Sequence, residues 1–306
     1  MSDLPALSPA LRRARARNDL RLGLPVCLKA PEGWWMAVSA DVPDQGFAPG
    51  SAVLASGGEP WPQGAPQPVA RAGLALAKQA GLLPKVRLWS VGKEEAGGVT
   101  LEVEEALASR RVTAEELDMV GEAALPLEGA PASRVRVYRE RYAPEEHLAL
   151  LIGTPGEVPL TRVHSSCLTG DVLGSLRCDC GSQLGRAIRQ MVEAGGGVLL
   201  YVSQEGRGIG IANKIRAYAL QDEGKDTVEA NLHLGFEVDE RDYSVASAML
   251  SQLGISRVRL LSNNPAKQAA LEALGVTVVE RVKLPGTVTE FNAGYLKAKA
   301  EKCGHG

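Results

Sequence analysis

The chain has 306 residues, which is enough for two domains with separate hydrophobic cores. Hydrophobic residues make up 45% and charged residues 23%, as in ordinary globular proteins, and the formal net charge is −2. This balance disfavours a nucleic-acid-binding protein, which usually carries a basic face, and no segment approaches the roughly 20 consecutive apolar residues that cross a bilayer.

The first 120 residues predict a small α+β domain. Helices are expected at 11–21 and 69–80, and strands at 25–30, 34–40 and 85–91, with a loop rich in Gly and Pro between Pro43 and Pro68. A helix is also expected to begin at Thr113, because the sequence TAEE fits a capping box. This region shows no dense cluster of His, Cys, Asp or Glu, and we expect an accessory domain over 1–120.

From residue 121 onward, strands alternate with helices of about ten to fifteen residues. Strands are expected at 134–142, 147–154, 196–203, 257–262 and 276–282, and the cysteine segment follows the residues VPLTRVHSS at 158–166. Helices are expected at 182–194, 211–224, 242–254 and 265–275, with a charged helix at the C-terminus. The alternation predicts a layered α/β (α+β) domain over 121–306, built on a mixed sheet with flanking helices.

Three of the five cysteines, Cys167, Cys178 and Cys180, fall within fourteen residues. The N-terminal residues lack the apolar run of a secretory signal, so we expect a cytoplasmic protein whose clustered cysteines bind metal or act in catalysis. A catalytic zinc takes three protein ligands and keeps a fourth position open, whereas a structural zinc takes four. His164 is the candidate for a fourth ligand, and three buried thiols without metal are the alternative.

Two motifs follow the cysteines. In QEGRGIG, which begins at Gln204 between a predicted strand and helix, glycines let backbone N–H groups approach an anion, and Arg207 suits a phosphate. A tight turn without function explains the same residues. On the next helix, Lys214 and Tyr218 are four apart, so they share one face and could point at one ligand. A solvated Lys and a half-buried Tyr are the alternative.

Two further motifs precede helices. In VDERDY, Asp239 and Arg241 could be an oriented base and its charged neighbour, or a solvated helix start. In LLSNNPAK, Ser262 and Lys267 lie at a strand end, where open α/β sheets bind ligands, although a helix cap explains the Ser and Pro equally well.

Together and in this order, these motifs resemble the GTP cyclohydrolase II family, which opens the guanine ring at the start of riboflavin synthesis. The matching text includes RVHSSCLTGDVLGSLRCDCGSQL, YVSQEGRGIGIANKIRAYALQDEGKDTVEAN, LGFEVDERDYSVA and VRLLSNNPAK, and the likeness runs from about Glu122 to the C-terminus. The resemblance implies a homodimer that hydrolyses GTP to 2,5-diamino-6-(5-phospho-ribosylamino)pyrimidin-4-one, formate and diphosphate. It also implies one catalytic zinc on the three cysteines, and magnesium with the triphosphate.

The resemblance assigns roles to individual residues. Arg241 matches the family's proposed nucleophile toward the α-phosphate, Asp239 its proton acceptor, and Tyr218 the tyrosine that positions the water or the opened ring. Because the pKa of arginine lies above about 12, electrostatic stabilisation by Arg241 is the alternative. Contacts with GTP are implied for Arg162, Val163, His164, Ser165, Ser166, Gln183, Glu205, Gly206, Arg207, Thr227, Ser262 and Lys267.

Three features depart from the family pattern. Ser166 stands where many members carry Glu, and Ser262 where many carry Thr. The region 1–120 is faintly similar at its start to dihydroxybutanone-phosphate synthase, but it is shorter and lacks that enzyme's acidic motif.

A catalytically silent GTP sensor that kept the pocket is the alternative function, although it would not need the cysteines, Tyr218, Asp239 and Arg241.

Overall fold

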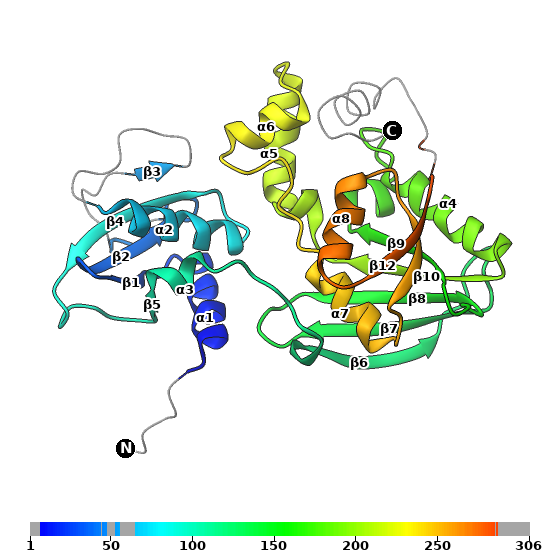
Figure 1. The fold of residues 1–306 in the computed structure, drawn as a ribbon. Coiled ribbons are helices and arrows are strands. Elements are labelled where there is room, and N and C mark those ends of the chain that lie inside the picture. Colours follow the sequence, from blue (N-terminus) through cyan, green and yellow to red (C-terminus); the bar gives the residue numbers. More distant parts are fainter. Residues whose placement is uncertain (1–6, 44, 48–52, 56–64, 285, 287–306) are drawn as a thin grey trace. The chain divides into compact units, whose positions relative to one another are not determined.

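The computed structural model describes residues 7–43, 45–47, 53–55, 65–284 and 286. Two compact units divide the chain (Figure 1). Unit 1 comprises 1–109, 212–220 and 229–240, and unit 2 comprises 110–211, 221–228 and 241–306. The first boundary falls after residue 109, and two later segments of the chain join unit 1.

Unit 1 is built on a five-stranded sheet of order β3-β4-β2-β1-β5. Its strands are β1 (Val26–Ala30), β2 (Gly33–Ser39), β3 (Val53–Ala55), β4 (Lys85–Val91) and β5 (Thr100–Glu102). Its helices are α1 (Pro9–Arg21), α2 (Gln67–Gln79) and α3 (Val103–Leu107), to which parts of α5 (Ile211–Asp222) and α6 (Thr227–His233) are added. The mixed α and β content agrees with the α+β expectation for this region.

The core of unit 1 forms where α2 lies on the sheet. Leu76 of α2 is fully buried with Leu28 of β1, Val86 of β4 and Leu101 of β5. Burying such aliphatic side chains contributes about 1.5–3 kcal/mol each. The start of α1 is set locally, because Ser8 accepts the backbone N–H of Leu11 at 3.3 Å and a proline occupies the first turn.

Unit 2 contains a seven-stranded mixed sheet of order β12-β11-β9-β10-β8-β7-β6 (Figure 1). The strands are β6 (Leu117–Ala124), β7 (Ser133–Glu140), β8 (Glu146–Gly153), β9 (Leu160–Ser165), β10 (Gly196–Val202), β11 (Arg257–Leu261) and β12 (Thr277–Val282). The four strands from β12 to β10 are parallel, and β8, β7 and β6 continue the sheet in antiparallel pairs. The predicted α/β class with a mixed sheet is confirmed.

Helices cover both faces of this sheet, and successive side chains of β10 pack against helices on opposite faces. Val198 and Leu200 pack in one core cluster with residues of α7 (Ser244–Gln252) and α8 (Pro265–Ala273). Leu199 points to the other face and packs with Ala187 of α4 (Cys180–Glu193). Since successive side chains of a strand point to opposite faces, a strand of nearly continuous apolar residues is what this two-sided burial requires.

The structure corrects one expected helix. Thr113 does form the expected capping box with Glu116, but only a single 3₁₀ turn, Ala114–Glu116, follows it. The chain then enters β6, which pairs with β7 along its length, so sheet pairing overrides the local helix preference. The short strand β3 lies inside the expected loop 43–68, and the expected C-terminal helix falls outside the described residues.

Candidate metal centre and ligand site

Three parallel strands of unit 2 end at the same edge of the sheet. β9 lies between β11 and β10. The chain leaves β9 toward Cys167, leaves β10 into the loop 203–210, and leaves β11 toward Ser262. Because the carboxyl ends of neighbouring parallel strands meet at one edge, three motifs that are far apart in the sequence gather there.

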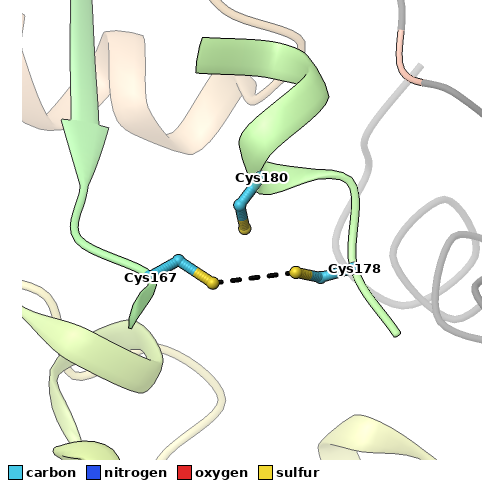
Figure 2. Close-up of side chains that lie close together, drawn as sticks. All are labelled: Cys167, Cys178 and Cys180. Carbon is cyan, nitrogen blue, oxygen red and sulfur yellow. Dashed lines mark hydrogen bonds between the residues drawn. The ribbon is translucent and has the colours of Figure 1, made fainter. Parts of the chain in front are cut away.

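The three cysteines converge beside this edge (Figure 2). Cys167 follows β9, Cys178 lies in the loop before α4, and Cys180 is the first residue of α4. Their Sγ atoms all lie within 4.8 Å of one another, and the Cys167 and Cys178 sulfurs are 3.6 Å apart. Within the part of the chain that the structure describes, this is the one group of His, Cys, Asp or Glu that could hold a metal ion.

The distance between the Cys167 and Cys178 sulfurs is compatible with two ligands of one zinc ion. Zinc–sulfur bonds of about 2.3 Å at tetrahedral angles separate two sulfurs by about 3.8 Å, close to the Cys167–Cys178 distance. Gly170 leaves the centre of the group open, because a Cβ at this position would lie 2.7 Å from the Cys178 Sγ and 3.1 Å from the Cys167 Sγ. Hydrogen bonding with the neighbouring thiols Cys167 and Cys178, together with burial, holds the pKa of Cys180 well above its ordinary value. Three thiolates therefore need a cation to coexist.

A buried aspartate that the motif analysis did not single out organises this centre. Asp171 lies on a single π-helical turn, Leu168–Val172, directly after the first cysteine. Its carboxylate accepts the backbone N–H of Cys167 at 3.0 Å and the hydroxyl of Tyr201 at 3.0 Å, and lies 3.0 Å from Nε2 of His164. Burial raises the pKa of Tyr201 above its usual range, so the phenol stays a hydrogen-bond donor.

His164 stands outside the group of three cysteines. Its ring stacks on Tyr201 with the centroids 5.5 Å apart, and burial lowers the pKa of the imidazole. Since the Nε2–H donates to Asp171, Nδ1 is left as the acceptor, and this buried atom has no hydrogen-bond partner among the described residues. An unsatisfied buried acceptor indicates a ligand group or a water at this position.

The QEGRG loop has an unusual backbone. Gly206 and Arg207 both have left-handed conformations, with φ of 63° and 62°, and Arg207 is the one non-glycine residue with positive φ among those described. Such a conformation costs a non-glycine residue about 1–2 kcal/mol, and strain of this kind clusters at ligand sites. The carboxylate of Glu205 accepts the N–H of Leu168 at 2.6 Å, which joins the loop to the residue after the first cysteine.

Gln204 links the loop to two other predicted segments. Its backbone N–H donates to the Ser166 hydroxyl at 3.2 Å, and its side-chain amide donates to the Ser165 hydroxyl at 3.0 Å. The amide oxygen accepts the backbone N–H of Asp242 at 3.2 Å. Ser166, the position that departs from the family pattern, thus supports the backbone of the loop.

A second buried network fixes the start of the same loop. His147 of β8 is 1% exposed; its Nδ1 accepts the backbone N–H of Ser203 at 3.1 Å and its Nε2 lies 2.9 Å from the carboxylate of Glu140. Glu140 in turn forms an ion pair with Arg110. Burial, followed by the charge of Arg110, lowers the pKa of His147 to about 4, so the imidazole is neutral at physiological pH.

The predicted arginine of β9 is buried beside the metal loop. Arg162 donates to the carbonyl of Leu261 at 3.0 Å and to the amide oxygen of Gln183 at 2.6 Å, and Gln183 donates to Asp179 between the last two cysteines. Burial lowers the pKa of Arg162 to about 10, so the guanidinium stays charged at neutral pH. Its Nε atom is buried and has no hydrogen-bond partner among the described residues, which leaves a donor for a ligand.

Lysine, arginine and tyrosine side chains also meet at this edge. Lys267 is buried, donates to the carbonyl of Val163 at 2.7 Å, and lies 5.8 Å from the ring centroid of Tyr243. Arg241 lies over the same ring at 5.5 Å. Ser262 accepts the backbone N–H of Asn264 at 3.1 Å, so its hydroxyl shapes the turn before α8. Arg241 and Lys267 therefore lie near the same tyrosine ring.

The remaining predicted residues lie elsewhere in the two units. Thr227 begins α6 in unit 2, and Tyr218 and Asp239 belong to the segments assigned to unit 1. Lys214 and Tyr218 share one face of α5, as expected from their spacing, with the Lys Nζ 5.8 Å from the ring centroid. The catalytic roles of Tyr218 and Asp239 stay predictions.

These features define the class of protein: an α/β protein with three cysteines that could hold a metal ion and, at the same sheet edge, buried basic side chains and a glycine-rich loop. The family model of GTP cyclohydrolase II matches residues 118–283. The GTP cyclohydrolase-2 of Azospirillum brasilense is 42% identical over 98% of this chain and 81% of that protein. That of Actinobacillus succinogenes is 57% identical over 53% of this chain and 75% of that protein. The riboflavin biosynthesis protein RibBA of Salinispora tropica is 49% identical over 68% of this chain and 52% of that protein.

The chain belongs to the GTP cyclohydrolase II family of enzymes. The family predicted from the motifs is confirmed. No helix of the described residues combines the length and apolar character that crossing a membrane requires.

Proposed function

We propose that this protein hydrolyses GTP to 2,5-diamino-6-(5-phospho-ribosylamino)pyrimidin-4-one, formate and diphosphate, the first step of riboflavin biosynthesis. The observation that carries the proposal is the group of three sulfurs at the same sheet edge as Arg162, the left-handed loop at Arg207, and Lys267. A hydrolase acting on a purine nucleotide needs a centre that activates water and a cationic surface for phosphates, and this edge offers both.

The cysteines Cys167, Cys178 and Cys180 would hold one zinc ion. When bound there with an open coordination position, the ion supplies Lewis acidity and lowers the pKa of water toward about 7. Side chains around the cysteines would position the reacting groups. Asp171 contacts the backbone N–H of Cys167 and the imidazole of His164 and would hold both in place. The buried Nδ1 of His164 would accept an N–H of the substrate.

The phosphates would be bound by the basic residues of the edge. Arg207 and Lys267 would contact phosphate oxygens, and magnesium would accompany the triphosphate because hard oxygen ligands suit that ion. Arg241 would stabilise negative charge at the α-phosphate, in keeping with a guanidinium whose pKa is too high for a ready nucleophile. Asp239 would accept a proton in that step, and Tyr218 would position the water or the opened ring.

The other contacts carried over from the family belong to the same proposal. They are Val163, Ser165, Ser166, Gln183, Glu205, Gly206, Thr227 and Ser262. We also propose a cytoplasmic homodimer, and a division of the chain into an accessory domain over 1–120 and a catalytic domain over 121–306. The first compact unit parts from the second after residue 109 and the family match begins at 118.

The test measures formate and diphosphate released from GTP by zinc-quantified protein with magnesium present. Cys178→Ala should lose bound zinc and formate release, whereas Cys27→Ala, which removes a buried thiol of unit 1, should keep both. Formate release by Cys178→Ala at the wild-type rate would contradict the metal assignment. Zinc and GTP binding by wild-type protein without any product would favour the alternative, a catalytically silent sensor.

A further inference from the structure

The segments 212–220 and 229–240 lie within the family match, yet they cluster with residues 1–109 in unit 1. They carry Tyr218 and Asp239, two of the three residues to which the proposed function gives catalytic roles. Contacts within unit 1 show how the N-terminal residues hold each segment.

The first anchor holds the turn that contains Asp239. Lys78, in the last turn of α2, donates to the carboxylate of Glu240 at 2.8 Å, with the two side chains only 20% and 22% exposed. The same Glu240 oxygen accepts the backbone N–H of Glu237 at 2.8 Å, which closes the turn 237–240 around Asp239. The Lys78 ammonium also lies 5.9 Å from the ring centroid of the buried Phe236. One lysine thus fixes the carboxylate that shapes the turn.

The second anchor holds α5, which carries Tyr218. Arg216 forms a two-pronged ion pair with Asp41, with N–O distances of 2.9 and 3.1 Å. Such a planar pair fixes orientation as well as distance. The fully buried Asn213 donates to the carbonyl of Gly81 at 3.2 Å and accepts from Arg216 at 2.7 Å. Asp41 is itself fixed, because it accepts the backbone N–H of Leu83 at 2.9 Å.

Two observations favour a role in the same reaction over a second activity. Among the described residues of 1–109, no group of three His, Cys, Asp or Glu side chains could hold a metal ion. The alignment with the Azospirillum brasilense GTP cyclohydrolase-2 covers 98% of this chain, so it includes the N-terminal region.

We propose that the N-terminal region positions two catalytic segments, with Lys78 fixing the Asp239 turn through Glu240 and Asp41 fixing α5 through Arg216. This inference rests on the proposed function, which gives Tyr218 and Asp239 their roles. Lys78 and Asp41 are positioning residues, and they act on turnover through the segments they hold.

The experiment compares Lys78→Arg, Lys78→Met, Lys78→Glu and the charge-swapped double variant Lys78→Glu/Glu240→Lys in the full chain. Formate release should fall roughly 10- to 100-fold in kcat for Lys78→Glu, because misplacing a catalytic group by about 1 Å can cost 10²-fold. The KM for GTP and the zinc content should change little, since the cysteines and basic residues of unit 2 are untouched. The kcat of Lys78→Met should fall less than that of Lys78→Glu, and the kcat of Lys78→Arg should stay near the wild-type value.

The double variant should recover only part of the loss. The ion pair reforms with its charges reversed, but the carboxylate that accepts the backbone N–H of Glu237 is gone. The matched control is Lys29→Glu, which breaks the ion pair with Glu102 at 2.6 Å elsewhere in unit 1; it should leave kcat unchanged. The midpoint of thermal unfolding of each variant shows whether a loss of activity comes from unfolding or from a displaced Asp239 turn in a folded protein.

The outcomes distinguish this inference from the proposed function. If wild type releases formate and Lys78→Glu, correctly folded, does so equally fast, the positioning role is wrong and the proposed function stands. A loss in Lys78→Glu that appears in KM or zinc content alone would also overturn it. If wild type with zinc and magnesium releases no formate, the proposed function itself fails.

Discussion

The Asp171 carboxylate lies 3.0 Å from Nε2 of His164 and accepts the backbone N–H of Cys167 with the same oxygen. One side chain therefore contacts both a buried imidazole and the backbone of Cys167, one of the three cysteines proposed to hold the metal. Groups that hydrogen-bond to metal ligands orient those ligands, and mutating them typically lowers metal affinity or activity.

Asp171→Asn should weaken zinc retention or lower turnover by about 10- to 100-fold, the usual cost of losing such a partner. Zinc content after dialysis against a weak chelator and formate release measure the two effects. Asp118→Asn is the control, because Asp118 pairs with Arg141 on the exposed surface. Wild-type zinc retention and turnover in Asp171→Asn would show that the carboxylate is dispensable.

Gly170→Ala should reduce the zinc bound per chain, because the added methyl group would enter the space between the sulfurs. Gly156→Ala is the matched control, since nothing lies within 4 Å of a Cβ at that position. Metal analysis of both purified variants is the measurement. Equal zinc content in the two would mean that the loop moves to make room without cost.

Arg207→Gly should weaken GTP binding and have only a small effect on the stability of the fold. Relief of the left-handed strain, about 1–2 kcal/mol, is offset by about 0.4–1 kcal/mol from the greater freedom of glycine in the unfolded chain. The free energy of unfolding should therefore change by less than about 2 kcal/mol, while the KM for GTP rises about tenfold or more through loss of a charged hydrogen bond.

Arg207→Asn provides the second variant for this test, because Asn tolerates the same backbone conformation without a guanidinium. Denaturant unfolding and steady-state kinetics should give the same pattern for both. An unchanged KM in two folded variants would remove Arg207 from the phosphate site.

His147 should make stability depend on pH. Its pKa is lowered from the ordinary 6.5 to about 4, so between these values the unfolded chain binds a proton that the folded protein does not. The stabilisation is fully present above pH 6.5 and is lost as the pH falls toward 4. The whole effect is at most about 3 kcal/mol, and about 2 kcal/mol of it should disappear between about pH 7 and about pH 5.

His147→Gln should therefore lose less stability than wild type over the same fall in pH, although it is less stable at neutral pH because the bonds to Ser203 and Glu140 are broken. Chemical denaturation at the two pH values measures the difference. His233→Gln, at an exposed position of α6, should follow wild type. If the stability of His147→Gln falls with pH as steeply as that of wild type, groups other than His147 cause the pH dependence.

Much of the fold was predictable because hydrophobic periodicity and turn residues indicated the same helices and strands. The strands β7, β8, β10, β11 and β12 and the helices α4, α5, α7 and α8 were expected close to their observed positions. The helix expected at Thr113 was wrong, because pairing with β7 draws the chain into β6 after one turn. The seven-residue α6 was not foreseen, since a helix this short shows little periodicity.

The chemistry of the site was predictable only in part. The spacing of Cys167, Cys178 and Cys180 indicated a metal group, and the structure brings their sulfurs together. Asp171 stands inside the same motif, but only the π-helical turn shows that it faces His164. The pairs Lys78–Glu240 and Asp41–Arg216 join residues 162 and 175 positions apart, and no local pattern predicts such partners.

The interior position of β9, with β10 on one side and β11 on the other, has a consequence for hydrogen exchange. Amides of β9 should be among the slowest to exchange with deuterated solvent, because exchange there requires opening of the sheet. The segments that follow β9 and β10 should exchange sooner. If the three cysteines hold zinc as proposed, adding zinc should slow exchange across 167–180 and leave exchange in β9 unchanged. The metal would then order the loops at this edge, whereas the strand beneath them is rigid without it.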